Sequence, residues 1–217
     1  MCGIAGSINS KRAFKLYQSN LNRGCYSTGL MTVGGWGQNY IEVSKILGTF
    51  NHHEPEFPEY STPIQYTLYH SRGPTVETKQ FNPDHNHPFE YKTWIVAHNG
   101  IVSNFEKLAK EHFSEEDFTA ATDSCIIPRL IYKFGLAAGL SKIEGTFAIW
   151  AYDKAHNIIY LARNSCTLYA NTDTGDFSST EFEGSKLLEE NSIYTLLDGK
   201  LVELPVKIES KSPYFIL

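Results

Sequence analysis

The 217-residue chain is poor in cysteine and has no cysteines close together in sequence. Its four cysteines are Cys2, Cys25, Cys125 and Cys166, and none of them forms a Cys-x-x-Cys motif. This spacing does not predict a zinc site. The even number leaves disulfides open, but a chain long enough to bury a sizeable core does not need them.

Long apolar runs are also missing. No segment approaches the roughly 20 apolar residues that a membrane-spanning helix needs. The first residues lack the basic and then apolar pattern of a signal peptide, because Ser7, Asn9 and Lys11 interrupt it early. We therefore expect a cytoplasmic protein that makes no contact with a membrane.

The chain has no run of lysine and arginine. It contains 19 Lys and Arg against 24 Asp and Glu, which gives a net charge of −5 at pH 7. A mildly acidic chain without a basic run is a poor binder of nucleic acids, and this excludes that class. Because 41% of the residues are hydrophobic and 20% are charged, the composition is that of an ordinary globular protein. A length of 217 residues fits one large domain or two small ones.

Motifs for metal ions and phosphate groups are missing too. Eight histidines are present, but His52, His53, His85 and His87 lie in proline-rich segments without the helical i, i+4 spacing of metal ligands. No GxxxxGK[ST] phosphate loop occurs. We expect neither a metal ion nor a cofactor.

The chain does contain segments in which apolar residues recur with the spacing of a helix or of a strand. This spacing predicts helices over residues 11–21, 104–112 and 122–134. It predicts strands over residues 3–8, 64–70, 93–97, 146–152 and 158–163, two strands within 29–43, and further short strands up to residue 204. Strands followed by helices and then strands favour a layered α+β domain with antiparallel sheets.

Several boundaries of these elements follow from individual residues. Asn104 and Thr122 are expected to cap the second and third helices, and Pro128 to kink the third. Asp198-Gly199 is expected to form a tight hairpin turn. The segment 47–63 is rich in Pro, His and Glu, and is expected to be a surface loop.

Cys2 directly follows the initiator methionine. If Met1 is removed, one residue carries both a thiol and a free α-amine, whose ordinary pKa values are about 8.5 and roughly 7.7–8.0. The amine can then accept the thiol proton near neutral pH, which makes Cys2 a candidate activated nucleophile. On this residue alone a buried structural cysteine is an equal alternative.

Five segments in a fixed order resemble the class II glutamine amidotransferases, which begin with a cysteine. They are Met1-Cys2-Gly3-Ile4-Ala5-Gly6, Asn22-Arg23-Gly24-Cys25-Tyr26-Ser27-Thr28-Gly29, His70-Ser71-Arg72-Gly73-Pro74-Thr75, His98-Asn99-Gly100-Ile101-Val102 and Thr122-Asp123. The resemblance implies that residues 1–217 form a single glutaminase domain with an N-terminal nucleophile fold, an αββα sandwich of two antiparallel sheets between helix layers. It also implies hydrolysis of the side-chain amide of glutamine and transfer of the ammonia to a second site.

The resemblance assigns the reaction itself to three residues. Cys2 would attack the amide carbon, with its own α-amine as the base. The Asn99 side chain and the Gly100 backbone N–H would stabilise the negative charge on the amide oxygen. Taken alone, Asn-Gly is instead the strongest short signal for a hairpin turn.

The resemblance assigns substrate binding to Arg72, which would bind the α-carboxylate, and to Asp123, which would bind the α-ammonium group. Without it, Arg72 would be an ordinary surface arginine and Asp123 an acidic residue in a first helical turn. Thr75 matches a position that lines the glutamine pocket. Arg23 and Gly24 match a structural pair beside the nucleophile.

The resemblance also covers two histidines, and the chain differs from the family pattern at two positions. His70 and His98 are expected to be packing residues. Gly73 stands where many relatives have an aromatic lid residue. Tyr26 replaces an aspartate of the family's Arg-Gly-x-Asp-Ser segment.

A chain that ends at residue 217 leaves no room for the acceptor domain that follows in most class II enzymes. We therefore expect a separate ammonia-accepting synthetase or transferase subunit as partner. The alternatives are an independent γ-glutamyl amidohydrolase and a catalytically silent binding or regulatory domain. We expect the mature protein to begin at Cys2.

Overall fold

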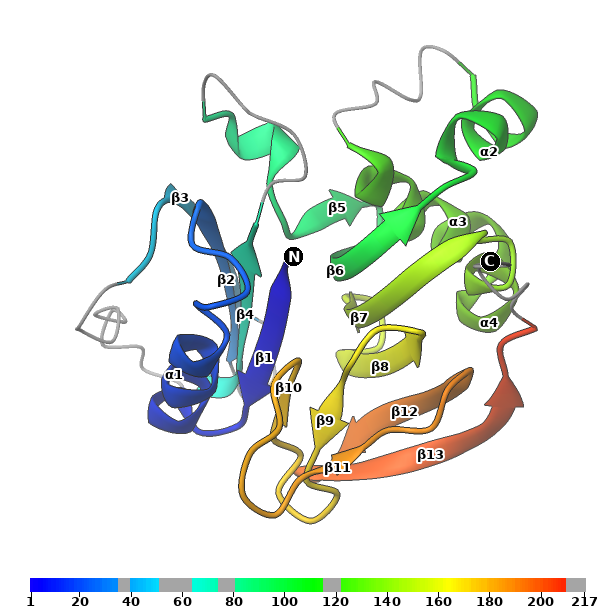
Figure 1. Ribbon diagram of the computed structural model, residues 1–217. Helices are drawn as coiled ribbons and strands as arrows, with labels where there is room; N and C mark the ends of the chain where they lie inside the picture. Colours follow the sequence, from blue (N-terminus) through cyan, green and yellow to red (C-terminus); the bar gives the residue numbers. More distant parts are fainter. Residues whose placement is uncertain (35–39, 51–63, 74–80, 115–121, 210–217) are drawn as a thin grey trace, which may run out of the picture.

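The computed structural model describes residues 1–34, 40–50, 64–73, 81–114 and 122–209. Two antiparallel sheets form its centre, and helices cover their outer faces (Figure 1). The predicted helix–sheet–sheet–helix sandwich is confirmed.

The first sheet has seven strands in the order β11-β9-β10-β1-β4-β2-β3. The short β1 lies inside this sheet and pairs with β4 and β10, so the chain begins beside the core rather than at an edge. The strands are β1 (Gly3–Ser7), β2 (Ser27–Gly34), β3 (Tyr40–Leu47), β4 (Ile64–Arg72), β9 (Tyr169–Ala170), β10 (Phe177–Ser178) and β11 (Lys186–Leu187).

The second sheet has six strands in the order β13-β12-β8-β7-β6-β5. The predicted hairpin is confirmed as β7 and β8, and the predicted turn at Asp198-Gly199, where both residues have positive φ, joins β12 to β13. The strands are β5 (Phe89–Tyr91), β6 (Trp94–Val102), β7 (Gly145–Asp153), β8 (Ile158–Asn164), β12 (Ser192–Leu197) and β13 (Lys200–Lys207).

The helices form two outer layers. α1 (Ser10–Ser19) lies on the first sheet, and its buried face is the predicted apolar one, with Phe14, Leu16 and Tyr17. The second sheet is covered by α2 (Phe105–His112), α3 (Ile126–Phe134) and α4 (Leu136–Leu140). Two 3₁₀ turns, η1 (Pro83–His85) and η2 (Asp123–Cys125), precede β5 and α3.

Three apolar clusters correspond to the three interfaces between these layers. The central cluster joins the inner faces of the sheets, with Ile4 and Leu68 from the first and Ala148 and Trp150 from the second. The two others lie under α1 and under α2–α4. Because a sheet with two buried faces must be apolar on both, its central strands are buried almost throughout, as β2 and β7 are.

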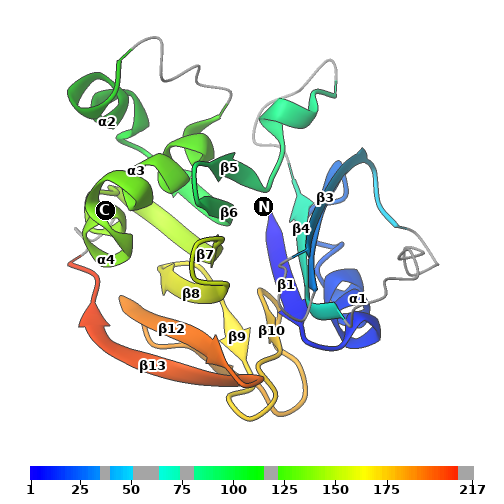
Figure 2. The ribbon, with the colours of Figure 1, turned by 180° about the vertical axis from the view of Figure 1, so that it is seen from behind.

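The N-terminus lies where the two sheets come together. Both views place it beside β4 and β6 (Figures 1 and 2), and β1 contacts β6 and β7 of the other sheet. The residue before β1 therefore lies close to both sheets.

Two predicted strand ends are wrong. β4 continues from His70 to Arg72, and β6 continues from Ala97 to Val102. The backbone groups of these polar residues pair with the neighbouring strands β2 and β7, which keeps them in the sheet. The pattern of apolar residues does not predict this pairing. Asn99-Gly100 consequently lies inside a strand, opposite Ala148 and Phe147, and is not a hairpin turn.

The predicted kink at Pro128 is also wrong. The α-helix begins only at Ile126, so Pro128 lies in its first turn, where a missing N–H costs nothing. Thr122 makes no side-chain cap. Asn104 makes none either, because its side chain instead accepts from the Glu144 N–H and donates to the Lys142 carbonyl.

The predicted loop at 47–63 has a different start. Leu47 is the last residue of β3, paired with Ser27, and residues 51–63 lie outside the described part of the chain. None of the helices in the described ranges has the length and apolar character that crossing a bilayer requires.

Candidate active site

The Cys2 thiol lies at the start of β1 in a half-buried position. Its Sγ is 3.8 Å from the carbonyl oxygen of Gly73. Burial raises the pKa of this thiol, and the Asp123 carboxylate acts in the same direction, while the Arg72 guanidinium opposes both. A thiol with a raised pKa is protonated at neutral pH, so it needs a base before it can act as a nucleophile.

Arg23 and Gly24 lie against the segment that carries Cys2. Arg23 Nε donates to the Cys2 carbonyl at 3.0 Å. A Cβ on Gly24 would lie 2.2 Å from the Gly73 nitrogen, and a Cβ on Gly73 would lie 2.4 Å from the Met1 carbonyl oxygen. These backbone segments approach too closely for any side chain, and this is the physical reason for glycine at both positions.

Arg72, the last residue of β4, is oriented by neutral groups. Its Nη1 donates to the His85 carbonyl at 3.0 Å and to Asn86 Oδ1 at 2.9 Å. Its Cζ lies 5.8 Å from the centre of the Tyr26 ring. No ion pair to Arg72 is formed within the described ranges, so its charge is available to a ligand carboxylate.

Asn99 and Gly100 come from β6, in the second sheet. The Asn99 side chain is 3% exposed, and its Nδ2 has no hydrogen-bond partner in the described part of the protein. An unpaired buried donor costs about 1–3 kcal/mol, and is typical of a group that pairs with a ligand. Gly100 has φ +146, and a Cβ there would lie 2.0 Å from the Thr146 carbonyl oxygen, so only glycine fits.

Asp123 comes from η2, between the second sheet and α3. Its Oδ2 accepts from the Val102 backbone N–H at 2.7 Å, which fixes the carboxylate against the end of β6. The adjacent Ser124 hydroxyl lies 3.4 Å from Asp123 Oδ1 and 2.9 Å from His98 Nδ1. Asp123 is thereby tied to the strand that carries Asn99 and Gly100.

Three buried histidines lie next to these residues. His70 and His87 stack with ring centres 3.9 Å apart, and His87 lies 6.3 Å from the His98 ring. His70 Nε2 donates to the His98 carbonyl at 3.2 Å. Burial lowers the pKa of all three, that of His70 to about 3. They are neutral at pH 7, consistent with the packing role expected of His70 and His98.

We expect this cluster to make the protein sensitive to acid. The unfolded chain binds a proton on His70 below about pH 6.5, whereas the folded chain does so only near pH 3. Stability is therefore lost as the pH falls through this window. Between pH 6.5 and 5 this single residue should lower the free energy of unfolding by about 2 kcal/mol.

Urea unfolding at pH 7 and pH 5 measures this effect. The His70→Gln variant, which keeps a donor for the His98 carbonyl, should lose about 2 kcal/mol less than the parent between the two pH values. An equal loss in both proteins would show that His70 is not held neutral by the fold.

The described residues thus bring most of the predicted site together. The Arg72 guanidinium and the Asp123 carboxylate both act on the pKa of the Cys2 thiol, in opposite directions. The register of β1 and β4 pairs Gly3, which follows Cys2, with Ser71, which precedes Arg72. Thr75 lies outside the described residues, and its predicted role stays a prediction.

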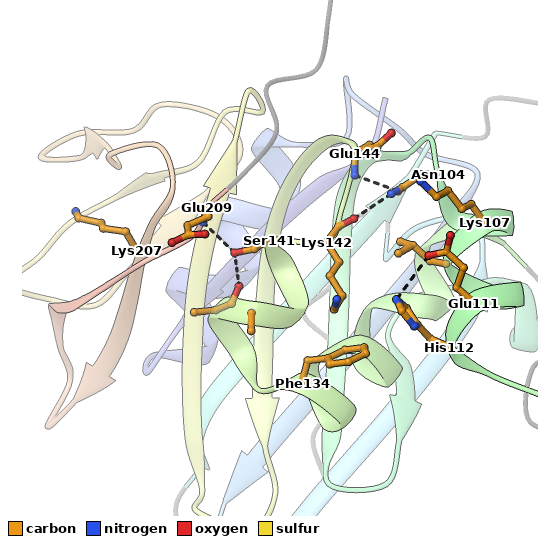
Figure 3. A pocket seen from close by; sticks show the side chains of 13 residues that line it. Asn104, Lys107, Glu111, His112, Phe134, Ser141, Lys142, Glu144, Lys207 and Glu209 are labelled. Atoms are coloured by element: carbon orange, nitrogen blue, oxygen red, sulfur yellow. Dashed lines mark hydrogen bonds and ion pairs between the residues drawn. The ribbon is translucent and has the colours of Figure 1, made fainter.

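A cavity of about 710 Å³ lies elsewhere, between α2, α4 and the end of β13 (Figure 3). None of the predicted site residues in the described part of the chain lines it. Its lining includes three lysines and three glutamates, Lys107, Lys142, Lys207, Glu111, Glu144 and Glu209, so charges of both signs are present in equal number. The predicted site residues that the structure describes lie elsewhere, around the start of β1.

A family model described as a glutamine amidotransferase domain matches residues 1–179. This chain belongs to that family. Glutamine–fructose-6-phosphate aminotransferase of Streptococcus pneumoniae is 24% identical over 93% of the chain and 35% of the relative. The corresponding enzyme of Chlamydia abortus is 26% identical over the whole chain and 38% of the relative. The chain thus spans little more than a third of the length of these relatives.

Solved structures show the same fold in other glutamine amidotransferases. The glutamine phosphoribosylpyrophosphate amidotransferase of B. subtilis matches with a TM-score of 0.68 at 15% identity, over 94% of this chain and 49% of that one. A glutamine aminotransferase class-II domain protein from Silicibacter pomeroyi matches with a TM-score of 0.51 at 13% identity, over 94% and 98% of the two chains. The resemblance to class II glutamine amidotransferases is confirmed.

The structure also shows how this amidotransferase domain accommodates its departures from the family pattern. Tyr26 presents its ring to Arg72, and Gly73 allows the close approach of the Met1 backbone.

Sequence reasoning missed Asn86 and Ser124 in this amidotransferase domain. Asn86 accepts from both Arg72 and Ser27, at 2.9 and 2.5 Å, and so connects two strands of the first sheet. Ser124 connects Asp123 to His98. The only feature of the sequence that could have indicated these two residues is their position, because Ser124 directly follows Asp123 and Asn86 directly precedes the buried His87.

Proposed function

We propose that this protein hydrolyses the side-chain amide of L-glutamine at Cys2 and supplies the ammonia to a separate acceptor enzyme. The observation that carries the proposal is the position of the Cys2 thiol, whose Sγ lies 3.8 Å from the carbonyl oxygen of Gly73, next to Arg72, and whose pKa is influenced by both Arg72 and Asp123. One cation and one anion beside a thiol are complementary to an α-amino acid, which carries a carboxylate and an ammonium group. Asn99, with its unpaired buried amide nitrogen, supplies a donor for a developing oxyanion.

In the proposed first step, the free α-amine of Cys2 accepts the thiol proton, and Sγ attacks the amide carbon of glutamine. The negative charge that forms on the amide oxygen is stabilised by Asn99 Nδ2 and the Gly100 N–H. The carbon–nitrogen bond then breaks, and the ammonium form of the amine returns the proton to the leaving ammonia.

In the second step, the same amine accepts a proton from water, and the resulting hydroxide attacks the thioester that Cys2 has formed. A second oxyanion forms in the same place and collapses to glutamate, and the amine returns its proton to the departing Cys2 sulfur, which restores the free thiol. Arg72 and Asp123 hold the α-carboxylate and the α-ammonium group throughout, which fixes the amide carbon against Sγ.

This mechanism requires removal of Met1, because a peptide bond to Met1 leaves the Cys2 nitrogen without basicity. The raised pKa of the Cys2 thiol makes the requirement strict, since the thiol does not ionise unaided at neutral pH. Intact mass should show active protein beginning at Cys2. Active protein that retains Met1 would contradict the mechanism.

The test of the function is labelling with a glutamine-like diazoketone, followed by peptide mapping and an ammonia assay. We expect one adduct, on Cys2, and competition by L-glutamine. The chain supplies its own control, because the exposed Cys25 should remain unmodified. No adduct in protein that begins at Cys2 would overturn the proposal and favour a silent binding domain.

The ammonia assay also tests the need for a partner. Slow hydrolysis by the chain alone, with stimulation by an acceptor synthetase or transferase, supports the proposed partner. Fast hydrolysis without any partner, together with turnover of substituted amides, would instead identify an independent γ-glutamyl amidohydrolase.

A further inference from the structure

His98, Ser124 and Asp123 form a buried chain of hydrogen-bonding groups, and the number of hydrogens in it is limited. His98 is 1% exposed and Ser124 is 5% exposed. The Ser124 hydroxyl lies 2.9 Å from His98 Nδ1 and 3.4 Å from Asp123 Oδ1. A hydroxyl has a single hydrogen, so it can donate to only one of these two neighbours.

The other nitrogen of His98 decides which neighbour receives it. His98 Nε2 lies 3.2 Å from the Thr146 carbonyl oxygen, and a carbonyl can only accept. Nε2 must therefore carry the hydrogen, and in the neutral ring Nδ1 is an acceptor. Ser124 then donates to His98, and Asp123 Oδ1 receives no hydrogen from it.

Protonation of His98 reverses this arrangement. The imidazolium carries hydrogens on both nitrogens, so Nδ1 donates to the Ser124 oxygen and the hydroxyl hydrogen turns to Asp123 Oδ1. Asp123 Oδ2 already accepts from the Val102 N–H. In that state both carboxylate oxygens are engaged by the protein, and a cation faces the carboxylate.

We propose that Ser124 and His98 form a proton-dependent hydrogen-bond switch that determines whether the Asp123 carboxylate is open to the α-ammonium group of the substrate. The proposal rests on the proposed function, because it assumes that Asp123 binds that group. His98 is a positioning residue here, since it acts on the substrate only through Ser124 and Asp123.

The groups around His98 fix the direction of the switch. From β4 it faces His70, from the segment before β5 it faces His87, and from η2 it faces Asp123. Burial lowers the pKa of His98, and the Asp123 carboxylate works against this. Neutral His98, with Asp123 open, is the state at pH 7, and the closed state forms on acidification.

The His98 ring also lies next to Gly100, whose N–H is proposed to stabilise the oxyanion. A Cβ on Gly100 would be 2.7 Å from His98 Nε2, and Thr146, which accepts from this nitrogen, lies on the neighbouring β7. Binding is therefore a cleaner readout than turnover, because a change at His98 can disturb both Asp123 and Gly100.

The experiment uses the full chain with Cys2→Ala, which binds glutamine without consuming it. Calorimetry gives Kd for L-glutamine and for 4-carbamoylbutanoate, which lacks the α-amino group, at half-unit steps from pH 7.5 to 4.5. Circular dichroism defines the range in which each variant stays folded. Below the pKa of His98, Kd for glutamine should rise by up to about tenfold per pH unit, because the binding-competent fraction falls by that factor.

The 4-carbamoylbutanoate Kd should change less than about threefold over the same range, because this ligand makes no bond to Asp123. Adding Ser124→Ala should reduce the acid rise for glutamine to less than about threefold. No hydroxyl hydrogen then turns to Asp123, and a buried imidazolium without an acceptor for its Nδ1–H is harder to form. For each variant the Kd at low pH is divided by the Kd of the same variant at pH 7.5. A substitution that changes the affinity equally at all pH values therefore does not affect the comparison.

Two further variants keep the test decisive. Ser124→Thr retains the hydroxyl and should retain the acid rise, whereas His98→Gln cannot titrate and should abolish it. The switch is overturned if Ser124→Ala keeps the full rise, if both ligands weaken equally, or if no rise occurs over the folded range. If glutamine fails to bind even at pH 7.5, the proposed function itself falls.

Discussion

Replacing Cys2 by alanine is expected to reduce ammonia release from L-glutamine by at least about 10³-fold, because the only proposed nucleophile is lost. The half-buried position of Cys2 at the start of an internal strand means that this change removes one sulfur atom without opening the core. A direct ammonia assay on protein that begins at residue 2 measures the loss.

Two control variants separate chemistry from folding. Cys25→Ala removes an exposed thiol only two residues after Arg23, and should change the rate less than about twofold. Cys2→Ser keeps the shape and the α-amine but supplies a poorer nucleophile, and should behave like Cys2→Ala. Full ammonia release by Cys2→Ala would remove the basis of the mechanism.

Replacing Asn99 by alanine is expected to lower kcat by about 10²–10³-fold, the usual cost of one oxyanion donor. In the free protein, Asn99 Nδ2 is buried without a partner in the described part of the chain, so its bond to the substrate oxygen is gained during the reaction. An interaction that strengthens in the transition state affects kcat more than KM. Steady-state kinetics with L-glutamine test this directly.

Arg72→Ala is the matched comparison for Asn99→Ala. The guanidinium is positioned by His85 and Asn86, and would bind the α-carboxylate equally in the ground state and the transition state. This variant should therefore chiefly raise KM. If both variants change kcat and KM in the same proportion, the assignment of the two roles is wrong.

Much of the fold was predictable because it depends on local periodicity. The apolar positions of α1, the hairpin of β7 and β8, and the turn at Asp198-Gly199 all lie where the pattern predicts them. The two errors in strand length share one cause. β4 and β6 extend to Arg72 and Val102 because neighbouring strands pair with their polar residues. The spacing of apolar residues along the chain does not predict such pairing between strands.

The site was predictable only as a set of residues. The order of its motifs indicated Cys2, Arg72, Asn99, Gly100 and Asp123, and their spacing said nothing of how they are held. Asn86 and Ser124 escaped notice because each works through a hydrogen bond to a residue that is distant in sequence or belongs to another element. A hydrogen-bond partner of this kind has no periodic signal.

By itself, the sequence determined that the protein is a layered α+β domain of the glutamine amidotransferase family, with a cysteine as its second residue. The tertiary structure decided the charges near that cysteine, the hydrogen bonding of Asn99 and the protonation of His98. Only folding brings the half-buried Cys2 thiol under the influence of Arg72 and Asp123, leaves Asn99 Nδ2 unpaired in the described part of the chain and keeps His98 neutral next to Gly100. The physical reason is that desolvation and hydrogen-bond geometry depend on atoms brought together from both sheets, whereas periodicity depends on neighbours along the chain.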